Sequence, residues 1–132
     1  MATPPVVLFV CLHGSAKSVM ASQYFSRLAR ERGLDAISDC AGTEPDAEIP
    51  PGVVRGLSDD GIDVSGLRPR PVTPADLERA SQVIAFGCEL GALAPAGLAI
   101  ERWDDVPAVS EDYGRARDAI VARVRALVER FA

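Results

Sequence analysis

The pattern of apolar and polar positions predicts strands and helices in alternation along the chain. Residues 6–10 form a continuous apolar run rich in β-branched side chains, which is typical of a strand buried on both faces. From Ser18 the apolar positions move to helical spacing, as at Met20, Tyr24 and Leu28. The same criteria predict strands at 36–40, 82–86 and 99–103, and helices at 51–60, from a Thr73 cap to about residue 80, and from a Ser110 cap towards the C-terminus.

This alternation implies right-handed crossovers and a three-layer α/β fold, in which a four-stranded, mostly parallel sheet carries helices on both faces. The 132 residues contain no internal repeat and no linker-like stretch, so a single domain over residues 1–132 is expected. Ligands of such sheets bind beyond the carboxyl ends of the strands. The loop after the first strand, residues 11–17, is therefore the first candidate for a functional site.

Composition narrows the classes of function. A formal net charge of −5 argues against nucleic acid as a partner, because a polyanion requires a basic face. No apolar run is long enough to cross a bilayer, and the first five residues carry no basic segment, so we expect a cytoplasmic protein that binds no membrane. Three cysteines in such a chain favour reduced thiols, and a single histidine without paired cysteines predicts neither a metal site nor a cofactor.

A cysteine follows the first strand, and the only lysine among 14 basic residues lies close behind it. Cys11 and Lys17 are separated by five residues, and a helix begins directly after them. Loop N–H groups and a helix N-terminus converge in such an arrangement on an anion. The same positive end favours the thiolate of Cys11, which can attack phosphorus or arsenic, and Ser18 can donate a hydrogen bond to it. The predicted oxyanion-binding residues are Leu12, His13, Gly14, Ser15, Ala16, Lys17 and Ser18.

The segment from Cys11 to Ser18 resembles the phosphate-binding loop of the low-molecular-weight protein tyrosine phosphatases and the thioredoxin-coupled arsenate reductases. That loop has a Cys, five residues, an Arg and a Ser or Thr between a strand and a helix. Four further segments are similar to family elements in the same order, at 41–45, 60–65, 83–86 and 103–107. The resemblance covers most of the chain. It implies the family's α/β fold, Cys11 as nucleophile, and phosphate or arsenate as the ligand.

The loop and the acid segment depart from the family pattern. Lys17 replaces the Arg, so a compact charge stands where the family has a planar fork for two oxygens. Gly14 replaces an Asn, and both residue types tolerate a left-handed conformation. No Asp-Pro pair is present for the general acid. Asp105, two residues before Pro107, is the first candidate for this role, and Asp104 is the second.

The set of additional cysteines that the arsenate reductases use is also incomplete in this sequence. Ala16 stands where the family can have a second loop cysteine. Cys88 lies one position after the expected first relay cysteine, and Ala94 occupies the second relay position. Arsenate reduction would therefore require an external thiol donor. Segments 42–45 and 61–65 nevertheless resemble the reductases more than the phosphatases.

The sequence supports three functions. The first is a cysteine-dependent phosphatase of phosphomonoesters, phosphorylated proteins included, in which Cys11 forms a phosphocysteine, Lys17 and the loop hold the oxyanion, and Asp105 protonates the leaving group. The second is an arsenate reductase with an external thiol donor. The third is a non-catalytic oxyanion-binding module. His13 is interpreted as a loop-shaping or rim residue rather than a base, because the sequence supplies it with no partner.

Overall fold

A computed structural model describes residues 3–95 and 97–132. Residues 1 and 2, which belong to the N-terminal segment without basic residues, lie outside the described part of the chain. Its sheet has four strands, β1 (Val6–Cys11), β2 (Ile37–Gly42), β3 (Gln82–Phe86) and β4 (Ile100–Arg102). They lie in the order β2-β1-β3-β4, and every pair is parallel. The predicted four-stranded sheet is confirmed, and it is parallel throughout.

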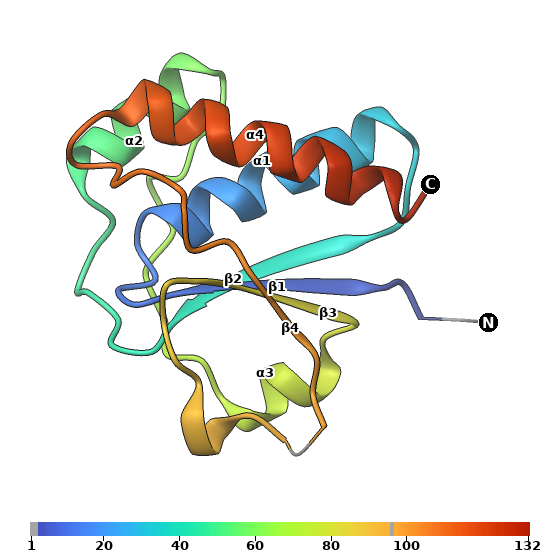
Figure 1. The fold of residues 1–132 in the computed structure, drawn as a ribbon. Coiled ribbons are helices and arrows are strands. Elements are labelled where there is room, and N and C mark those ends of the chain that lie inside the picture. The colour runs from blue at the N-terminus through green and yellow to red at the C-terminus, as the bar shows by residue number, and fades with distance from the viewer. Residues whose placement is uncertain (1–2, 96) are drawn as a thin grey trace.

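Helices cover both faces of this sheet, as expected for a three-layer fold (Figure 1). On one face lie α1 (Lys17–Glu31), α2 (Pro51–Asp59) and α4 (Tyr113–Glu129). The other face carries α3 (Pro74–Arg79) and the short 3₁₀ turn η1 (Gly91–Leu93). In the described part of the chain, no helix is both long and apolar enough to cross a membrane.

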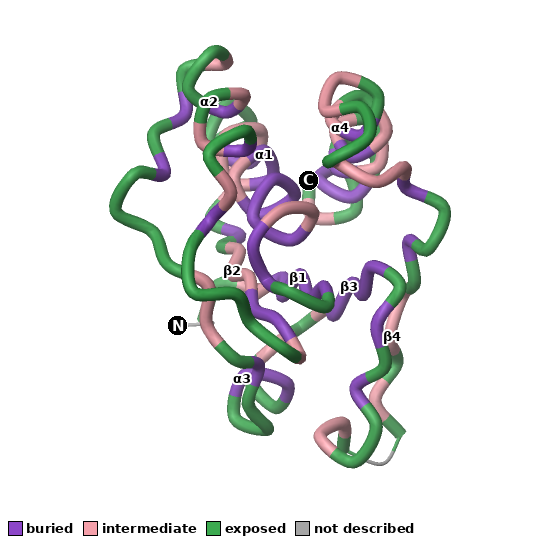
Figure 2. The backbone as a smooth tube through the Cα atoms, turned by 90° about the vertical axis from the view of Figure 1, so that its left-hand side faces the viewer, coloured by how far each residue is buried: buried purple, intermediate pink, exposed green. Residues whose placement is uncertain are grey.

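β1 is the centre of the hydrophobic core, which explains its unbroken apolar run. Successive side chains of a strand point to opposite faces, so Phe9 packs towards α1 and α4 while Val10 packs towards α3. Phe9 contacts the rings of Phe25, Phe86 and Trp103. Figure 2 shows burial concentrated along β1, β3 and the start of α1. The first loop therefore follows directly from one of the most deeply buried strands of the molecule.

Several element boundaries differ from the sequence prediction. The last helix begins at Tyr113 after an Asp112 cap, not after Ser110, because the Asp112 carboxylate accepts a hydrogen bond of 3.0 Å from the Arg115 N–H. β2 continues beyond the predicted residue 40 to Gly42, since it pairs with β1 as far as Cys11. The predicted start of α3 is confirmed, and Thr73 and Asp76 form a reciprocal capping box there.

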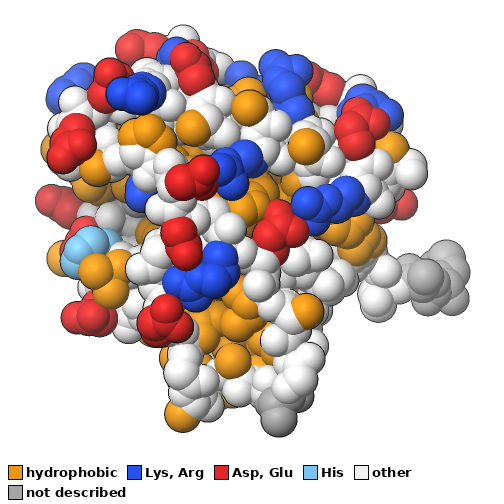
Figure 3. Space-filling model, in the orientation of Figure 1, with side chains coloured by type: hydrophobic (Ala, Val, Ile, Leu, Met, Phe, Trp, Pro, Cys, Tyr) orange, Lys and Arg blue, Asp and Glu red, His pale blue; other side chains and the backbone are white. Residues whose placement is uncertain are grey.

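Acidic and basic side chains are interspersed on the face that carries α4 and β4 (Figure 3). Ion pairs account for this mixture, among them Arg102 with Asp104, Arg123 with Asp105, and Arg130 with Glu101. This face therefore presents no extended basic surface of the kind that binds a polyanion.

Candidate active site

Cys11 is the last residue of the central strand, and its thiol is almost enclosed, with 7% of the residue exposed. Its Sγ lies 3.0 Å from the Ser18 hydroxyl and accepts a hydrogen bond of 3.2 Å from the Gly14 N–H. Ser18 is fully buried in the first turn of α1. The Gly14 N–H thus donates to the sulfur, and the Ser18 hydroxyl lies within hydrogen-bond distance of it.

The loop is pressed against the end of β2. Gly14 has φ +61°, and a Cβ added there would lie 2.7 Å from the backbone nitrogen of Gly42. A Cβ on Gly42 would in turn lie 2.6 Å from the Gly14 nitrogen. The Thr43 and Glu44 N–H groups donate to the carbonyls of Cys11 and Leu12, at 3.2 and 2.7 Å. The loop's curve therefore depends on two glycines in contact, one at each side.

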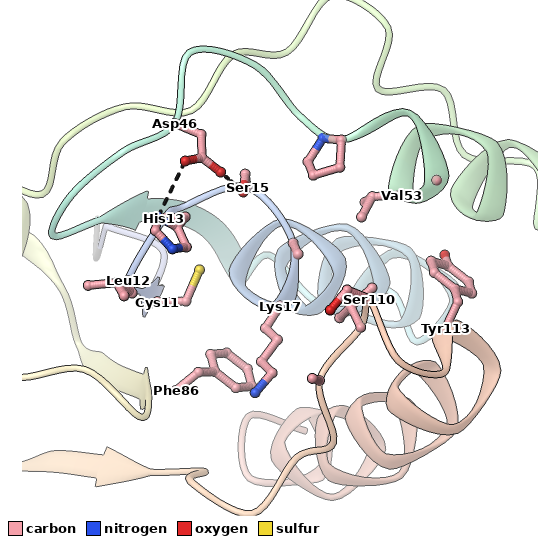
Figure 4. Close-up of a pocket in the computed structure, with 15 residues that line it drawn as sticks. Cys11, Leu12, His13, Ser15, Lys17, Asp46, Val53, Phe86, Ser110 and Tyr113 are labelled. Atoms are coloured by element: carbon pink, nitrogen blue, oxygen red, sulfur yellow. Dashed lines mark hydrogen bonds and ion pairs between the residues drawn. The ribbon is translucent and has the colours of Figure 1, made fainter.

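α1 begins at Lys17, directly behind the loop, and no side chain of the described residues caps it. Its first N–H groups therefore keep the capacity to bind an anion. The Lys17 side chain lines the cavity above Cys11, but its ammonium donates to the Val106 carbonyl at 3.0 Å. Figure 4 shows the ammonium directed away from the Cys11 sulfur. Lys17 thus ties the segment before α4 to the loop and, in this conformation, does not point into the anion position.

A cavity of about 560 Å³ opens over the Cys11 thiol. Leu12, His13, Ser15, Ala16 and Lys17 line its floor, whereas Gly14 and Ser18 lie beneath the lining. The walls come from the loop before α2 and the first turn of α2, from the end of β3, and from the segment leading into α4 together with the first residue of α4. Their apolar members are Pro50, Val53, Phe86, Ala108, Val109 and Tyr113. This space is larger than an inorganic oxyanion requires, and it falls in the range of pockets that hold small organic ligands.

An acidic residue that the sequence analysis missed, Asp46, also lines the cavity. One of its carboxylate oxygens lies 3.3 Å from His13 Nδ1, and the other accepts a hydrogen bond of 2.9 Å from the Ser15 hydroxyl (Figure 4). Its backbone N–H donates to the His13 carbonyl at 3.0 Å. The available signal was its position just after β2, at the same edge of the sheet as Cys11.

Neither predicted acid lies in the cavity lining of this structure. Asp105 is paired with Arg123, and 75% of its side chain is exposed. Asp104 accepts hydrogen bonds from Arg102 and from the Gly87 N–H, at 2.9 and 2.8 Å, and these bonds hold its pKa below the usual range. The structure therefore brings Cys11 together with the loop and with Lys17, but not with Asp104 or Asp105.

The other two thiols lie apart from the cavity lining. Cys88 is buried in the core on the α3 side, where its thiol donates to the Val10 carbonyl at 3.6 Å, and burial raises its pKa. Burial likewise raises the pKa of Cys40 to about 12. Both are poor attacking thiols at neutral pH. Within the described residues, no three His, Cys, Asp or Glu side chains come together as a metal site.

The parallel α/β sheet carries the Cys11 thiol at the end of its central strand, beside loop and helix N–H groups of the kind that hold an oxyanion. Residues 6–99 match the family described as low molecular weight phosphotyrosine protein phosphatase. The chain belongs to this family, whose fold is shared by arsenate reductases.

The similar proteins include both arsenate reductases and protein tyrosine phosphatases. A Halobacterium salinarum protein that carries the provisional name of an arsenate reductase is 28% identical over 93% of this chain and 90% of its own. A thioredoxin-dependent arsenate reductase of Corynebacterium glutamicum superposes with a TM-score of 0.79 and 30% identity, over 99% of this chain but only 64% of that longer one. A low molecular weight protein tyrosine phosphatase from T. tengcongensis gives a TM-score of 0.85 at 24% identity, over 96% and 99% of the two chains.

Proposed function

We propose that this chain is a phosphatase that hydrolyses phosphomonoesters through a phosphocysteine on Cys11. The observation that carries the proposal is the apolar cavity over the thiol. Arsenate alone would leave most of its walls without contact, whereas the organic part of an ester can occupy it. Tyr113 and Val53 offer apolar surface to an aromatic ring, and a phosphorylated tyrosine is a substrate that carries such a ring.

In the proposed reaction the Cys11 thiolate attacks phosphorus in line with the ester oxygen. The N–H groups of the loop and of α1 hold the equatorial oxygens, and Ser18 stabilises the thiolate before attack and after its release. Lys17 supplies positive charge at the cavity wall and would exchange the Val106 carbonyl for a phosphate oxygen. Asp105, the donor expected from the sequence, would have to leave Arg123 and enter the cavity to reach the leaving oxygen.

Arsenate reduction is the second candidate, and the two arsenate reductase relatives named above favour it. Arsenate would take the place of phosphate on Cys11. The burial of Cys88 on the α3 side of the sheet argues against an internal relay. This candidate therefore requires an external thiol donor such as a thioredoxin.

Two parallel assays separate these functions. Purified protein is mixed rapidly with p-nitrophenyl phosphate, and the reaction is quenched in acid for mass spectrometry of the Cys11 peptide. We expect a burst of nitrophenol with a phosphoryl adduct on Cys11, and neither in Cys11→Ser. The second assay follows loss of arsenate in the presence of thioredoxin and its reductase. Arsenate loss without ester turnover would overturn the phosphatase proposal, and phosphate binding without either reaction would indicate a binding module.

A further inference from the structure

His13 and Asp46 form an imidazole–carboxylate pair at the mouth of the cavity. The sequence predicted His13 only as an oxyanion-loop or rim residue without a partner, and it gave no role to Asp46. Nδ1 of the ring faces the carboxylate, so Nε2 is the nitrogen left for the cavity that His13 lines. Asp46 is fixed at both ends, through its side chain to Ser15 and through its N–H to the His13 carbonyl. The carboxylate thus sets the ring's orientation (Figure 4).

The cavity needs a proton donor for an ester oxygen, and few groups can reach it. The described titratable side chains in its lining are Cys11, His13, Lys17, Asp46 and Tyr113. Cys11 is the nucleophile, and Lys17 is the cation that takes a phosphate oxygen in the proposed reaction. The hydroxyl of Tyr113 is buried, and burial raises its pKa, so it is a weak acid at neutral pH. Of the described side chains in the lining, His13 with its partner Asp46 therefore remains as the candidate proton donor for the ester oxygen.

Charge balance supports the same choice. A carboxylate in an oxyanion site repels the substrate unless a cation faces it. Nδ1 of His13 lies 3.3 Å from the Asp46 carboxylate, so the imidazole is the group that faces this carboxylate at the rim of the cavity.

We propose that His13, oriented by Asp46, is the general acid and base of the reaction; this rests on the proposed phosphatase function. As the S–P bond forms, the P–O bond breaks, and its electron pair goes to the leaving oxygen. That oxygen takes the Nε2 proton, which leaves an alcohol or phenol, a phosphocysteine and neutral His13. Neutral Nε2 then accepts a proton from a water whose oxygen attacks phosphorus. The S–P bond breaks, Cys11 leaves as thiolate, phosphate is released and the imidazolium is restored.

The test compares two esters that differ in leaving-group basicity, p-nitrophenyl phosphate and phenyl phosphate. An acid contributes about 10²–10⁴-fold where the leaving oxygen is basic. His13→Gln should therefore lower kcat/KM for phenyl phosphate by about 10² or more, and for p-nitrophenyl phosphate by less than about 10-fold. Addition of imidazole should restore part of the phenyl phosphate activity of His13→Ala. The matched carboxylate control is Glu78→Gln, on α3 at the opposite face, which should leave both rates unchanged.

Asp46 is a positioning residue, and its readout is the contrast between the two esters. Asp46→Asn leaves the imidazole ring without its orienting partner, so it should lower kcat/KM for phenyl phosphate more than for p-nitrophenyl phosphate, whereas damage to the loop alone would lower both rates alike. Protection of Cys11 from alkylation by phosphate shows that each variant keeps its loop. His13 is well exposed, so its replacement leaves the core intact.

The outcomes distinguish a failure of the proposed role of His13 from a failure of the proposed phosphatase function. Active wild type with equal losses on both esters in His13→Gln would overturn the role of His13 alone. That role is also overturned if Asp105→Asn shows the leaving-group contrast and His13→Gln does not. A wild-type protein that releases neither phenol and forms no phosphocysteine would overturn the phosphatase function, and the role of His13 with it.

Discussion

Replacing Gly14 with alanine tests how tightly the nucleophile loop is packed against β2. Two separate costs arise at this position. The left-handed backbone, at φ +61°, disfavours an alanine by about 1–2 kcal/mol. The new Cβ would also meet the Gly42 backbone at 2.7 Å, and crowding of this kind costs roughly 1–3 kcal/mol. We therefore expect Gly14→Ala to lose about 2–5 kcal/mol of unfolding free energy.

Two other glycines separate these costs. Gly33 has φ +66° with nothing within 4 Å of its Cβ position, so Gly33→Ala carries the backbone strain alone, about 1–2 kcal/mol. The φ of Gly42 lies outside the left-handed region, yet its Cβ would lie 2.6 Å from the Gly14 nitrogen, so Gly42→Ala carries the crowding alone, about 1–3 kcal/mol.

Urea unfolding of the three variants measures stability, and phosphate protection of Cys11 from iodoacetamide measures the loop. Gly33→Ala should keep full protection, while Gly14→Ala and Gly42→Ala should lose most of it because the loop must shift. The order of destabilisation should place Gly14→Ala first. If Gly14→Ala cost no more than Gly33→Ala and kept its protection, the close contact between the loop and β2 would be refuted.

Three further predictions concern the thiols, a helix cap and the lysine. Iodoacetamide at pH 7 should modify Cys11 before Cys88, because burial raises the pKa of Cys88; peptide mapping that finds Cys88 labelled first would contradict this. Burial opposes ionisation of Asp76, but hydrogen bonds from Arg70 and Thr73 outweigh it and keep the Asp76 pKa low. This contribution to stability is complete above about pH 4 and is lost as pH falls further, so the difference in unfolding free energy between wild type and Asp76→Asn should close in acid. Lys17→Ala should weaken phosphate binding about tenfold to hundredfold, the worth of one charge-assisted hydrogen bond; titration of the phosphate protection measures it, and an unchanged affinity would show that Lys17 serves only to hold Val106.

Local signals in the sequence determined the elements and their order. The apolar run at 6–10 predicted the buried central strand, because a strand covered on both faces carries apolar side chains on both of them. Thr73 and Asp76 predicted the start of α3, because a capping box is made entirely within four residues. The loop from Cys11 to Ser18 was also readable, since its chemistry is contiguous in the chain.

Contacts between distant segments were decided only by the tertiary structure. The pairing of His13 with Asp46 depends on how β2 lies beside β1, and no periodicity encodes it. The hydrogen bond from Lys17 to the Val106 carbonyl joins the start of α1 to the segment before α4, which are far apart in the sequence. It turns the side chain of an expected anion ligand towards a carbonyl group. The position of Ser110 in the cavity wall was likewise decided by packing, whereas the Asp112 cap of α4 is a local bond to the Arg115 N–H. Local propensity sets which residues form an element, whereas packing in three dimensions sets which side chains meet at the site.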